Sequence, residues 1–228
     1  FLFLIKELTT ISGIGEKNAI KLISEYKIKS FQDLKNKVKN SKVELTNAQN
    51  IGLKYYNDLN QRIPRKEITK SKRIIDELIK NINPDIKMEI VGSYRRKKKD
   101  SGDIDVLFSH KTNYLTQIIE SLKDTGYLLD QISKGSKKYS GIFKIDEFGR
   151  RIDILFIKPE NYPTALLYFT GSGEHNQKMR AIAKNKGYKL NEYNLLDEDG
   201  NKIIVKSEED IFKKLEMEYL EPNKREVK

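Results

Sequence analysis

The 228-residue chain contains no cysteine and no tryptophan, and its only histidines are His110 and His175. A chain without cysteine forms no disulfide and offers no thiolate to a metal, and two imidazoles are too few for the common zinc sites. No apolar run is long enough to span a bilayer, and the opening FLFLI is too short for the core of a signal peptide. We therefore expect no membrane partner.

Basic residues, in contrast, are abundant. Lysine and arginine total 44 against 33 aspartates and glutamates, so the net charge is +11 and the pI is near 9.4. A balance this basic favours a polyanionic partner such as nucleic acid. The length suits one large domain or two to three smaller units, and a content of 37% hydrophobic and 34% charged residues is typical of a globular chain with a highly charged surface.

The pattern of apolar residues divides the chain into three parts. Residues 1–63 are predicted to be helical, with Thr46 capping a last helix that Pro64 ends. Residues 64–160 alternate amphipathic helices with short strand-like runs, and residues 161–228 combine helices with a hairpin over EDGN. Helix and strand mixed in this way predict an α/β or α+β sheet with helices packed on it.

Two strand-like runs carry acids that a buried strand does not tolerate without compensation. In DIDVLF, residues 103–108, Asp103 and Asp105 point to one face of a strand, with their Cα atoms roughly 7 Å apart. In RRIDILFI, residues 150–157, Asp153 stands opposite an apolar face in the same way. If the two strands are neighbours, three carboxylates converge, and their hard oxygen atoms suit Mg²⁺ rather than zinc. The competing interpretation is that these aspartates are solvent-facing residues of amphipathic strands.

The residues that precede DIDVLF are suited to binding phosphate. Gly92–Ser93 ends a strand-like run in a turn, and Ser101–Gly102 offers a second close approach of the backbone. Five consecutive basic residues, 95–99, supply positive charge beside both. Phosphate held between basic groups and metal-loaded carboxylates is the arrangement of a phosphoryl-transfer site.

These motifs together resemble those of one family. The stretch GSYRRKKKDSGDIDVLF resembles the GS…SGD-x-D nucleotidyltransferase motif of the family X DNA polymerases. Other segments resemble family counterparts in the same order from Thr9 to Arg225: SGIGEK, QRIPRKE, RRIDILFI, LYFTGSGEHNQKMRAIAKNKGY, LNEYNL and EEDIFKKLEMEYLEP. The resemblance implies a helix-hairpin-helix DNA-binding subdomain over residues 1–63. It also implies a nucleotidyltransferase-type palm with a mixed β-sheet over 64–160 and a small α+β nucleotide-selection subdomain over 161–228.

The resemblance also assigns roles in catalysis and nucleotide binding. It implies that Asp103, Asp105 and Asp153 hold two Mg²⁺ ions, for which Mn²⁺ is a possible substitute, and that Arg151 orients these carboxylates. Asp153 would serve only the ion beside the primer 3′-OH. The residues that it assigns to the incoming nucleotide are Arg62, Ser93, Arg96, Ser101, Gly102, Tyr168, Phe169, Gly171 and Asn176.

Contacts with DNA are implied in the same way. Arg180 is assigned to the template, four positions from Asn176 on one helix face. The turn SGIG is assigned to a DNA phosphate, through Gly13, Gly15 and Lys17. The carbonyl groups assigned to a monovalent cation, Na⁺ or K⁺, at this turn are those of Thr9, Ile11 and Ile14.

Three positions depart from the family pattern. Leu155 stands where a well-known member has an arginine that changes partners during closure, so that switch is in doubt. Gly173 replaces an acidic residue that packs on the incoming base, and Gln177 replaces a template-side lysine. We expect a weaker grip on the nucleotide or altered fidelity. No counterpart of the family's lyase domain precedes Phe1, so we expect no lyase activity from this sequence.

The expected function is that of a template-directed DNA polymerase that fills short gaps during base-excision-type repair. Its partners would be gapped or primer–template DNA and dNTPs, and we expect a monomer. Two alternatives stay open: a template-independent nucleotidyltransferase on the same scaffold, and a catalytically inactive DNA-binding repair scaffold. The expected location is a nucleus, a bacterial cytoplasm or a viral replication site.

Overall fold

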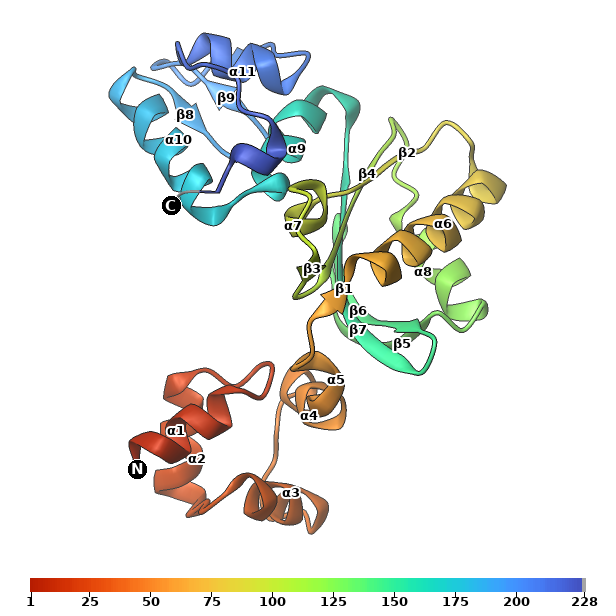
Figure 1. Cartoon of the computed structure of the whole chain (residues 1–228), viewed down its shortest axis with the longest axis vertical. Helices are drawn as coiled ribbons and strands as arrows, with labels where there is room; N and C mark the ends of the chain where they lie inside the picture. The colour runs from red at the N-terminus through yellow and green to blue at the C-terminus, as the bar shows by residue number, and fades with distance from the viewer. Residues whose placement is uncertain (227–228) are drawn as a thin grey trace.

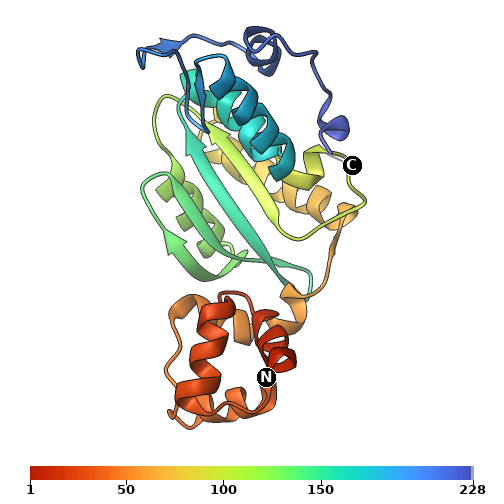
Figure 2. The same ribbon diagram turned by 90° about the vertical axis from the view of Figure 1, so that its left-hand side faces the viewer.

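The computed structural model describes residues 1–226 and has three parts arranged along its longest axis (Figure 1). A helical part lies at one end, a sheet with its helices lies in the middle, and a small mixed part lies at the other end (Figures 1 and 2). Each part has its own cluster of buried apolar side chains. The combination of helix and strand predicted from the sequence is confirmed.

The helical part contains five helices: α1 (Leu2–Thr9), α2 (Glu16–Tyr26), α3 (Phe31–Lys39), α4 (Asn47–Lys54) and α5 (Tyr56–Leu59). The predicted cap at Thr46 is confirmed, because its side chain accepts from the Gln49 N–H while the Gln49 side chain accepts from the Thr46 N–H. The single helix predicted from Thr46 to Pro64 is wrong. It breaks between α4 and α5, and residues 63–64 form a short strand instead. Proline disfavours helical geometry at the residue before it, and Ile63 is drawn into the core of the central part.

The central part is a five-stranded sheet with the order β2-β4-β7-β6-β5. Only β4 and β7 run parallel, so the sheet is mixed as predicted. Its strands are β2 (Lys87–Ile90), β4 (Ile104–Ser109), β5 (Leu128–Lys134), β6 (Lys138–Ile145) and β7 (Phe148–Ile157). Its helices are α6 (Arg65–Ile82), the single turn α7 (Gly92–Arg95) and α8 (Leu115–Asp124). A separate two-stranded ribbon pairs β1 (Ile63–Pro64) with β3 (Asp100–Ser101).

The two faces of the sheet are covered differently. On one face, alternate residues of β4 and β7 form the main core with α6 and α8; from β4 these are Ile104, Val106 and Phe108. On the other face, Leu107, Leu155 and Ile157 form a cluster with α9 (Tyr162–Thr170). Asp105 and Asp153 alternate onto this second face, at the half of each strand before these apolar residues. The face is therefore apolar where α9 covers it and acidic where α9 does not.

The third part follows η1 (Pro159–Asn161) and begins with α9. Its other elements are α10 (Gly173–Asn185), the three-stranded antiparallel sheet β8 (Lys189–Leu190), β9 (Leu195–Leu196) and β10 (Lys202–Ile203), α11 (Glu208–Lys214) and η2 (Pro222–Lys224). The hairpin predicted over EDGN is confirmed as the turn between β9 and β10. The last two residues of the predicted segment 161–228 lie outside the described residues.

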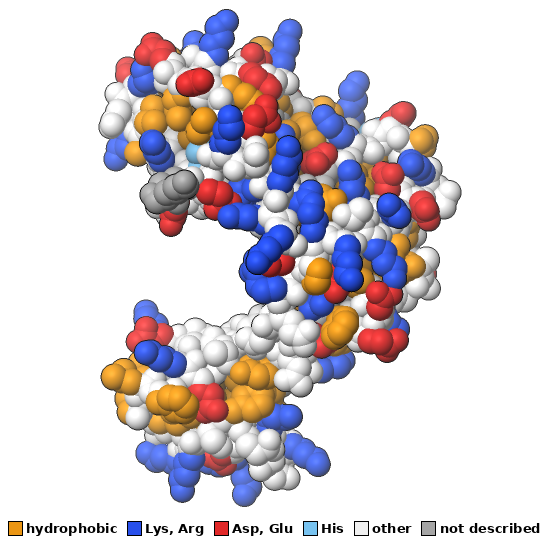
Figure 3. All heavy atoms as spheres, in the orientation of Figure 1, with side chains coloured by type: hydrophobic (Ala, Val, Ile, Leu, Met, Phe, Trp, Pro, Cys, Tyr) orange, Lys and Arg blue, Asp and Glu red, His pale blue; other side chains and the backbone are white. Residues whose placement is uncertain are grey.

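The molecule is hollowed on one side. Figure 3 shows a deep concavity between the helical part and the C-terminal part, with lysine and arginine side chains gathered along its inner wall near α7. Within residues 1–226, no helix has both the length and the apolar character that crossing a membrane requires.

Candidate active site

Three aspartates meet at the uncovered half of the sheet. Asp105 and Asp153 are direct partners in the parallel β4–β7 register, and Asp103 lies at the bend just before β4 begins. One carboxylate oxygen from each residue can be chosen so that all three lie within 4.8 Å of one another. No other group of three His, Cys, Asp or Glu side chains in residues 1–226 meets this spacing. The predicted convergence of the three carboxylates is present in the structure.

The electrostatics of this cluster call for a counter-ion. Burial of its carboxyl group, and then the charges of Asp103 and Asp153, raise the pKa of Asp105 to about 8. Burial and the charge of Asp153 also raise the pKa of Asp103. Arg151 contacts the cluster directly, with Nε donating to Asp153 Oδ2 over 3.0 Å. One guanidinium does not balance three carboxylates, so the residues fit hard divalent cations, which bind the charged form of each acid.

The backbone beside the cluster is shaped to admit Asp105. Gly92, at the start of α7, has a φ of +59°, and a Cβ at this position would lie 2.2 Å from Asp105 Oδ2. The Val91 N–H donates to the Asp105 carbonyl over 2.9 Å, which holds the two segments together. Only glycine supplies both the space and the backbone conformation, so the predicted turn at Gly92–Ser93 serves the carboxylate cluster directly.

Two pockets of about 400 Å³ each flank the carboxylates. One contains seven of the residues predicted to bind nucleotide or template beside two of the aspartates; its lining is Gly92, Ser93, Arg96, Asp103, Asp105, Tyr168, Phe169, Gly171, Gly173, Asn176, Gln177 and Arg180. The other lies toward β6 and β7, and its polar lining includes Ser140, Arg151, Asp105 and Asp153. Asp105 and Phe169 are shared by both pockets, so the carboxylates form the boundary between two binding spaces.

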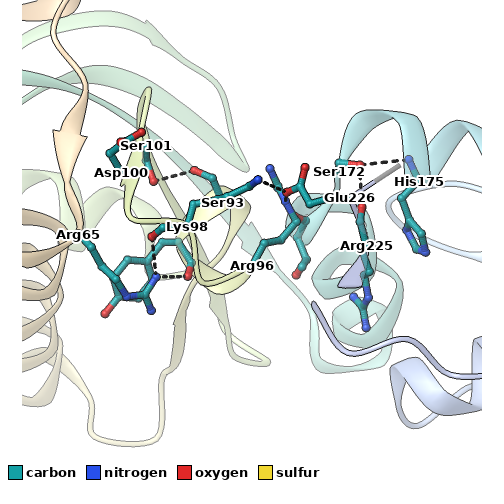
Figure 4. Close-up of polar contacts among 12 residues, drawn as sticks. Arg65, Ser93, Arg96, Lys98, Asp100, Ser101, Ser172, His175, Arg225 and Glu226 are labelled. Carbon is teal, nitrogen blue, oxygen red and sulfur yellow. Dashed lines mark hydrogen bonds and ion pairs between the residues drawn. The ribbon is translucent and has the colours of Figure 1, made fainter. Parts of the chain in front are cut away.

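Three more residues predicted to bind nucleotide lie at the β1–β3 ribbon. Ser101, in β3, accepts a hydrogen bond from Ser93 Oγ at 2.6 Å (Figure 4). Arg62 donates from Nε to Asp100 Oδ1 at 2.8 Å, and its Nη1 is 3.3 Å from the place that a Cβ on Gly102 would occupy. The pairing of β1 with β3 therefore brings the arginine of QRIPR beside the SGD motif.

The predicted phosphate ligand Arg96 is already engaged by a carboxylate. Its Nε donates to Glu226 Oε1 at 2.6 Å, and its Nη1 donates to the Thr170 carbonyl at 2.6 Å (Figure 4). The hydrogen bond from Arg96 lowers the pKa of Glu226. Glu226 was not among the predicted site residues, because nothing in the local sequence REVK indicates that it reaches across 130 positions to α7.

The pocket wall opposite α7 is formed by α9 and α10. Asn176 Nδ2 donates to the Tyr168 carbonyl at 2.6 Å, and the Arg180 guanidinium lies 5.8 Å from the centre of the Tyr168 ring. The two helix positions predicted to face the base pair therefore share one surface. Gly173 and Gln177, two of the departures from the family pattern, line the same pocket.

The third departure, Leu155, is buried in the apolar cluster beneath α9. Its partner in the β6–β7 register is Lys138, whose ammonium lies 3.8 Å from Glu192.

A buried ion network, which the sequence did not indicate, ties α7 to the C-terminal part. Arg95 donates two hydrogen bonds to Glu208, at 2.9 and 2.8 Å, and Arg225 donates a third at 2.7 Å. Burial alone would raise the pKa of Glu208, but these bonds hold it below its ordinary value. The Arg225 carbonyl accepts from the Ser172 hydroxyl at 2.8 Å (Figure 4). The network fixes Arg225 beside the first turn of α10.

The residues predicted to bind DNA backbone lie at the turn between α1 and α2. Gly13 has a φ of +87°, Gly15 is the N-cap of α2, and Lys17 is exposed in its first turn. Of the residues predicted to hold a monovalent cation, Ile11 and Ile14 anchor the turn in the core of the helical part, and Thr9 ends α1. The Ile11 carbonyl accepts from the Ile14 N–H at 3.0 Å.

Comparisons with known proteins agree with this geometry. Family models match three consecutive segments: the fingers domain of DNA polymerase lambda over residues 6–60, the DNA polymerase beta palm over 62–159 and the DNA polymerase beta thumb over 165–226. Two solved structures of Leishmania infantum polymerase beta superpose with TM-scores of 0.92. The ternary gap complex is 30% identical, with 98% of this chain and 90% of that chain covered. The ternary P/T complex is 31% identical, with 99% of each covered.

Curated relatives are longer than this chain. DNA polymerase lambda of Rattus norvegicus is 32% identical over 96% of this chain and 41% of its own length. DNA nucleotidylexotransferase of Xenopus laevis is 26% identical over 96% of this chain and 51% of its own length. The chain thus spans two-fifths to one half of the curated relatives that it matches.

Proposed function

The chain belongs to family X of the DNA polymerases, the family of polymerases beta and lambda, and we propose that it extends a primer 3′-hydroxyl with dNTPs under the direction of a template. The observation that carries the proposal is the position of the three aspartates between two pockets, one of which gathers the residues predicted to bind nucleotide. We propose that the other pocket, toward β6 and β7, receives the 3′ end of the primer.

The reaction is attack of the primer 3′-oxygen on the α-phosphorus of the dNTP, with pyrophosphate as the leaving group. Asp103, Asp105 and Asp153 are the residues that would hold the divalent metal, which we propose to be two Mg²⁺ ions. When bound, these ions supply charge stabilisation to the attacking and leaving oxygens. The protein groups then position the reactants, because phosphoryl transfer relies mainly on alignment and charge neutralisation.

The nucleotide pocket offers a separate group for each part of a dNTP. Ser93, in α7, and Arg96, which directly follows α7, line the pocket, and we propose that they contact the triphosphate. We propose that Tyr168 and Phe169 contact the sugar and that Asn176 and Arg180, from α10, contact the base pair, because all four line this pocket. We propose that Arg62, Ser101 and Gly102 complete the triphosphate contacts from the β1–β3 ribbon.

DNA would lie in the basic concavity of Figure 3. The turn that carries Gly13, Gly15 and Lys17 offers backbone N–H groups at the start of α2 to a DNA phosphate, next to a monovalent cation held by carbonyls of the same turn. We propose short-gap filling in DNA repair as the biological role and a monomer as the working form. Binding should weaken steeply with salt, because lysines and arginines displace counterions from the DNA.

Substitution of Asp153 by Asn tests the proposal. We expect Asp153→Asn to abolish extension of a primer at a one-nucleotide gap while leaving the Kd for gapped DNA nearly unchanged. Asp146→Asn is the matched control, because Asp146 is an exposed aspartate in the β6–β7 turn, paired with Lys70 away from the cluster. Robust extension by Asp153→Asn would refute the role of this carboxylate.

Template-independent transfer is the second candidate, supported by the match to a nucleotidylexotransferase over nearly the whole chain. The two are separated by changing the template base in a one-nucleotide gap. Nucleotide choice that follows the template base supports the templated polymerase, and extension of single strands without such choice supports the transferase. A third outcome, with Mg²⁺ affecting neither dNTP binding nor turnover, would leave an inactive DNA-binding scaffold.

A further inference from the structure

The third aspartate has a hydrogen-bond partner that the sequence did not bring to attention. Ser140, in the middle of β6, is the direct cross-strand partner of Asp153 in β7. Its hydroxyl donates to Asp153 Oδ1. The residue is 8% exposed, so the hydroxyl is largely shielded from water that would otherwise compete for it.

Ser140, Arg151 and Asp153 each contact the other two. The Arg151 Nη2 lies 3.3 Å from both Ser140 Oγ and Asp153 Oδ1, and its Nε donates to Asp153 Oδ2 at 3.0 Å. The two donors approach the carboxylate from different strands, β6 and β7. A carboxylate held from one side only can swing about its side-chain torsions, whereas donors from two strands fix its plane.

Hydrogen bonds that fix the carboxylate matter more for Asp153 than for Asp105. The side chain of Asp153 is 33% exposed, and it faces the wide pocket toward β6. Asp105, in contrast, is confined by Gly92 and the α7 backbone. The position of the Asp153 carboxylate therefore depends more on hydrogen bonds than that of Asp105 does.

We propose that Ser140 is a positioning residue for the divalent-metal site, acting by holding the Asp153 carboxylate in the orientation that completes the three-aspartate cluster. This inference rests on the proposed function, in which Asp153 is a metal ligand. Partners that orient metal-binding side chains typically contribute on the order of 10- to 100-fold to metal affinity or activity. Ser140 accordingly sets how much divalent metal the chain needs.

Ser140→Ala removes the hydroxyl, and Ser140→Thr retains it on a residue that strands favour. Ser136 is the matched control, because it is an exposed serine between β5 and β6 and lines neither of the two pockets. The readouts are the Mn²⁺ Kd of the full chain without DNA, from the electron paramagnetic resonance signal of free Mn²⁺, and the Mg²⁺ concentration for half-maximal single-turnover extension. Thermal unfolding confirms that each variant is folded.

We expect Ser140→Ala to weaken Mn²⁺ binding by roughly 10- to 100-fold and to raise the Mg²⁺ requirement in parallel, with the Kd for gapped DNA unchanged. Ser136→Ala should match the parent, and Ser140→Thr should restore most of the affinity. A folded Ser140→Ala variant with the parent's Mn²⁺ affinity would overturn the inference. Asp153→Asn distinguishes failure of this inference from failure of the proposed function. If Asp153→Asn loses Mn²⁺ affinity while Ser140→Ala does not, only the role of Ser140 is wrong. If Asp153→Asn loses neither Mn²⁺ binding nor primer extension, the proposed function is wrong too.

Discussion

The buried side chain of His175 is expected to make the free energy of unfolding depend on pH. It lies on α10, is 3% exposed, and its ring centre is 5.9 Å from that of Phe212 in the core of the C-terminal part. Neither ring nitrogen has a hydrogen-bond partner among the described residues. Burial, followed by the positive charges of Arg225 and Lys178, lowers the pKa of His175 to about 4, and Glu208 offsets only part of this.

The sign of the pH effect follows from this lowered pKa. The unfolded chain takes up a proton on His175 near pH 6.5, whereas the folded chain resists protonation until about pH 4. The contribution to stability is therefore complete above pH 6.5 and is lost as the pH falls toward 4. A difference of about 2.5 pH units corresponds to roughly 3 kcal/mol, of which about 2 kcal/mol is already lost at pH 5.

The experiment is urea unfolding of the parent, His175→Leu and His110→Gln at pH 7.5 and pH 5, followed by far-ultraviolet circular dichroism. The chain has only two histidines, and the second, His110, is partly exposed, which makes His110→Gln a matched control. We expect the parent and His110→Gln to lose about 2 kcal/mol more than His175→Leu between the two pH values. Equal losses in the parent and His175→Leu would refute the burial argument.

Three further predictions concern other parts of the site. Glu208→Ala leaves buried arginines without their carboxylate and should cost about 3–5 kcal/mol in urea unfolding, whereas loss of less than about 1 kcal/mol would contradict the buried network. Gly92→Ala places a Cβ against the Asp105 carboxylate and should lower single-turnover extension by on the order of 100-fold, and parent-like extension would show that the close approach is not required. Glu226→Gln weakens the hold on Arg96 and should lower the KM for dNTP by roughly two- to fivefold, and a higher KM would instead mean that Glu226 orients Arg96 for the nucleotide.

The carboxylate cluster could be predicted from the sequence because the side chains of a strand alternate between only two faces. Alternation places Asp105 opposite Val106, and the same alternation in RRIDILFI places Asp153 on a matching face. What the pattern left open was whether the two strands are neighbours, and the structure answers this with a parallel β4–β7 pair in which the two aspartates are in register. Asp103 was predicted to lie within the strand, but β4 begins one residue after it, at Ile104.

Contacts between segments far apart in the chain could not be predicted from the sequence in this way. The partner of Arg96 is 130 positions away, and that of Arg95 is 113 positions away. Neither pair has a local periodicity that would reveal it, because each depends on how the C-terminal part docks on α7. Ser140 was missed for a similar reason: its run, GIFKI with the preceding serine, reads as a strand, but only the β6–β7 register shows which aspartate it faces.

Arg95 and Arg96 are adjacent residues at the end of one helical turn, yet they serve different neighbours. The first donates hydrogen bonds to the buried carboxylate of Glu208, and the second lines the pocket that we propose binds the nucleotide. Because the two residues are adjacent, any rotation of the C-terminal part that displaces Glu208 also displaces the backbone of Arg96. Docking of the C-terminal part thus positions Arg96 in two ways, through the backbone that it shares with Arg95 and through its own bonds to Glu226 and the Thr170 carbonyl.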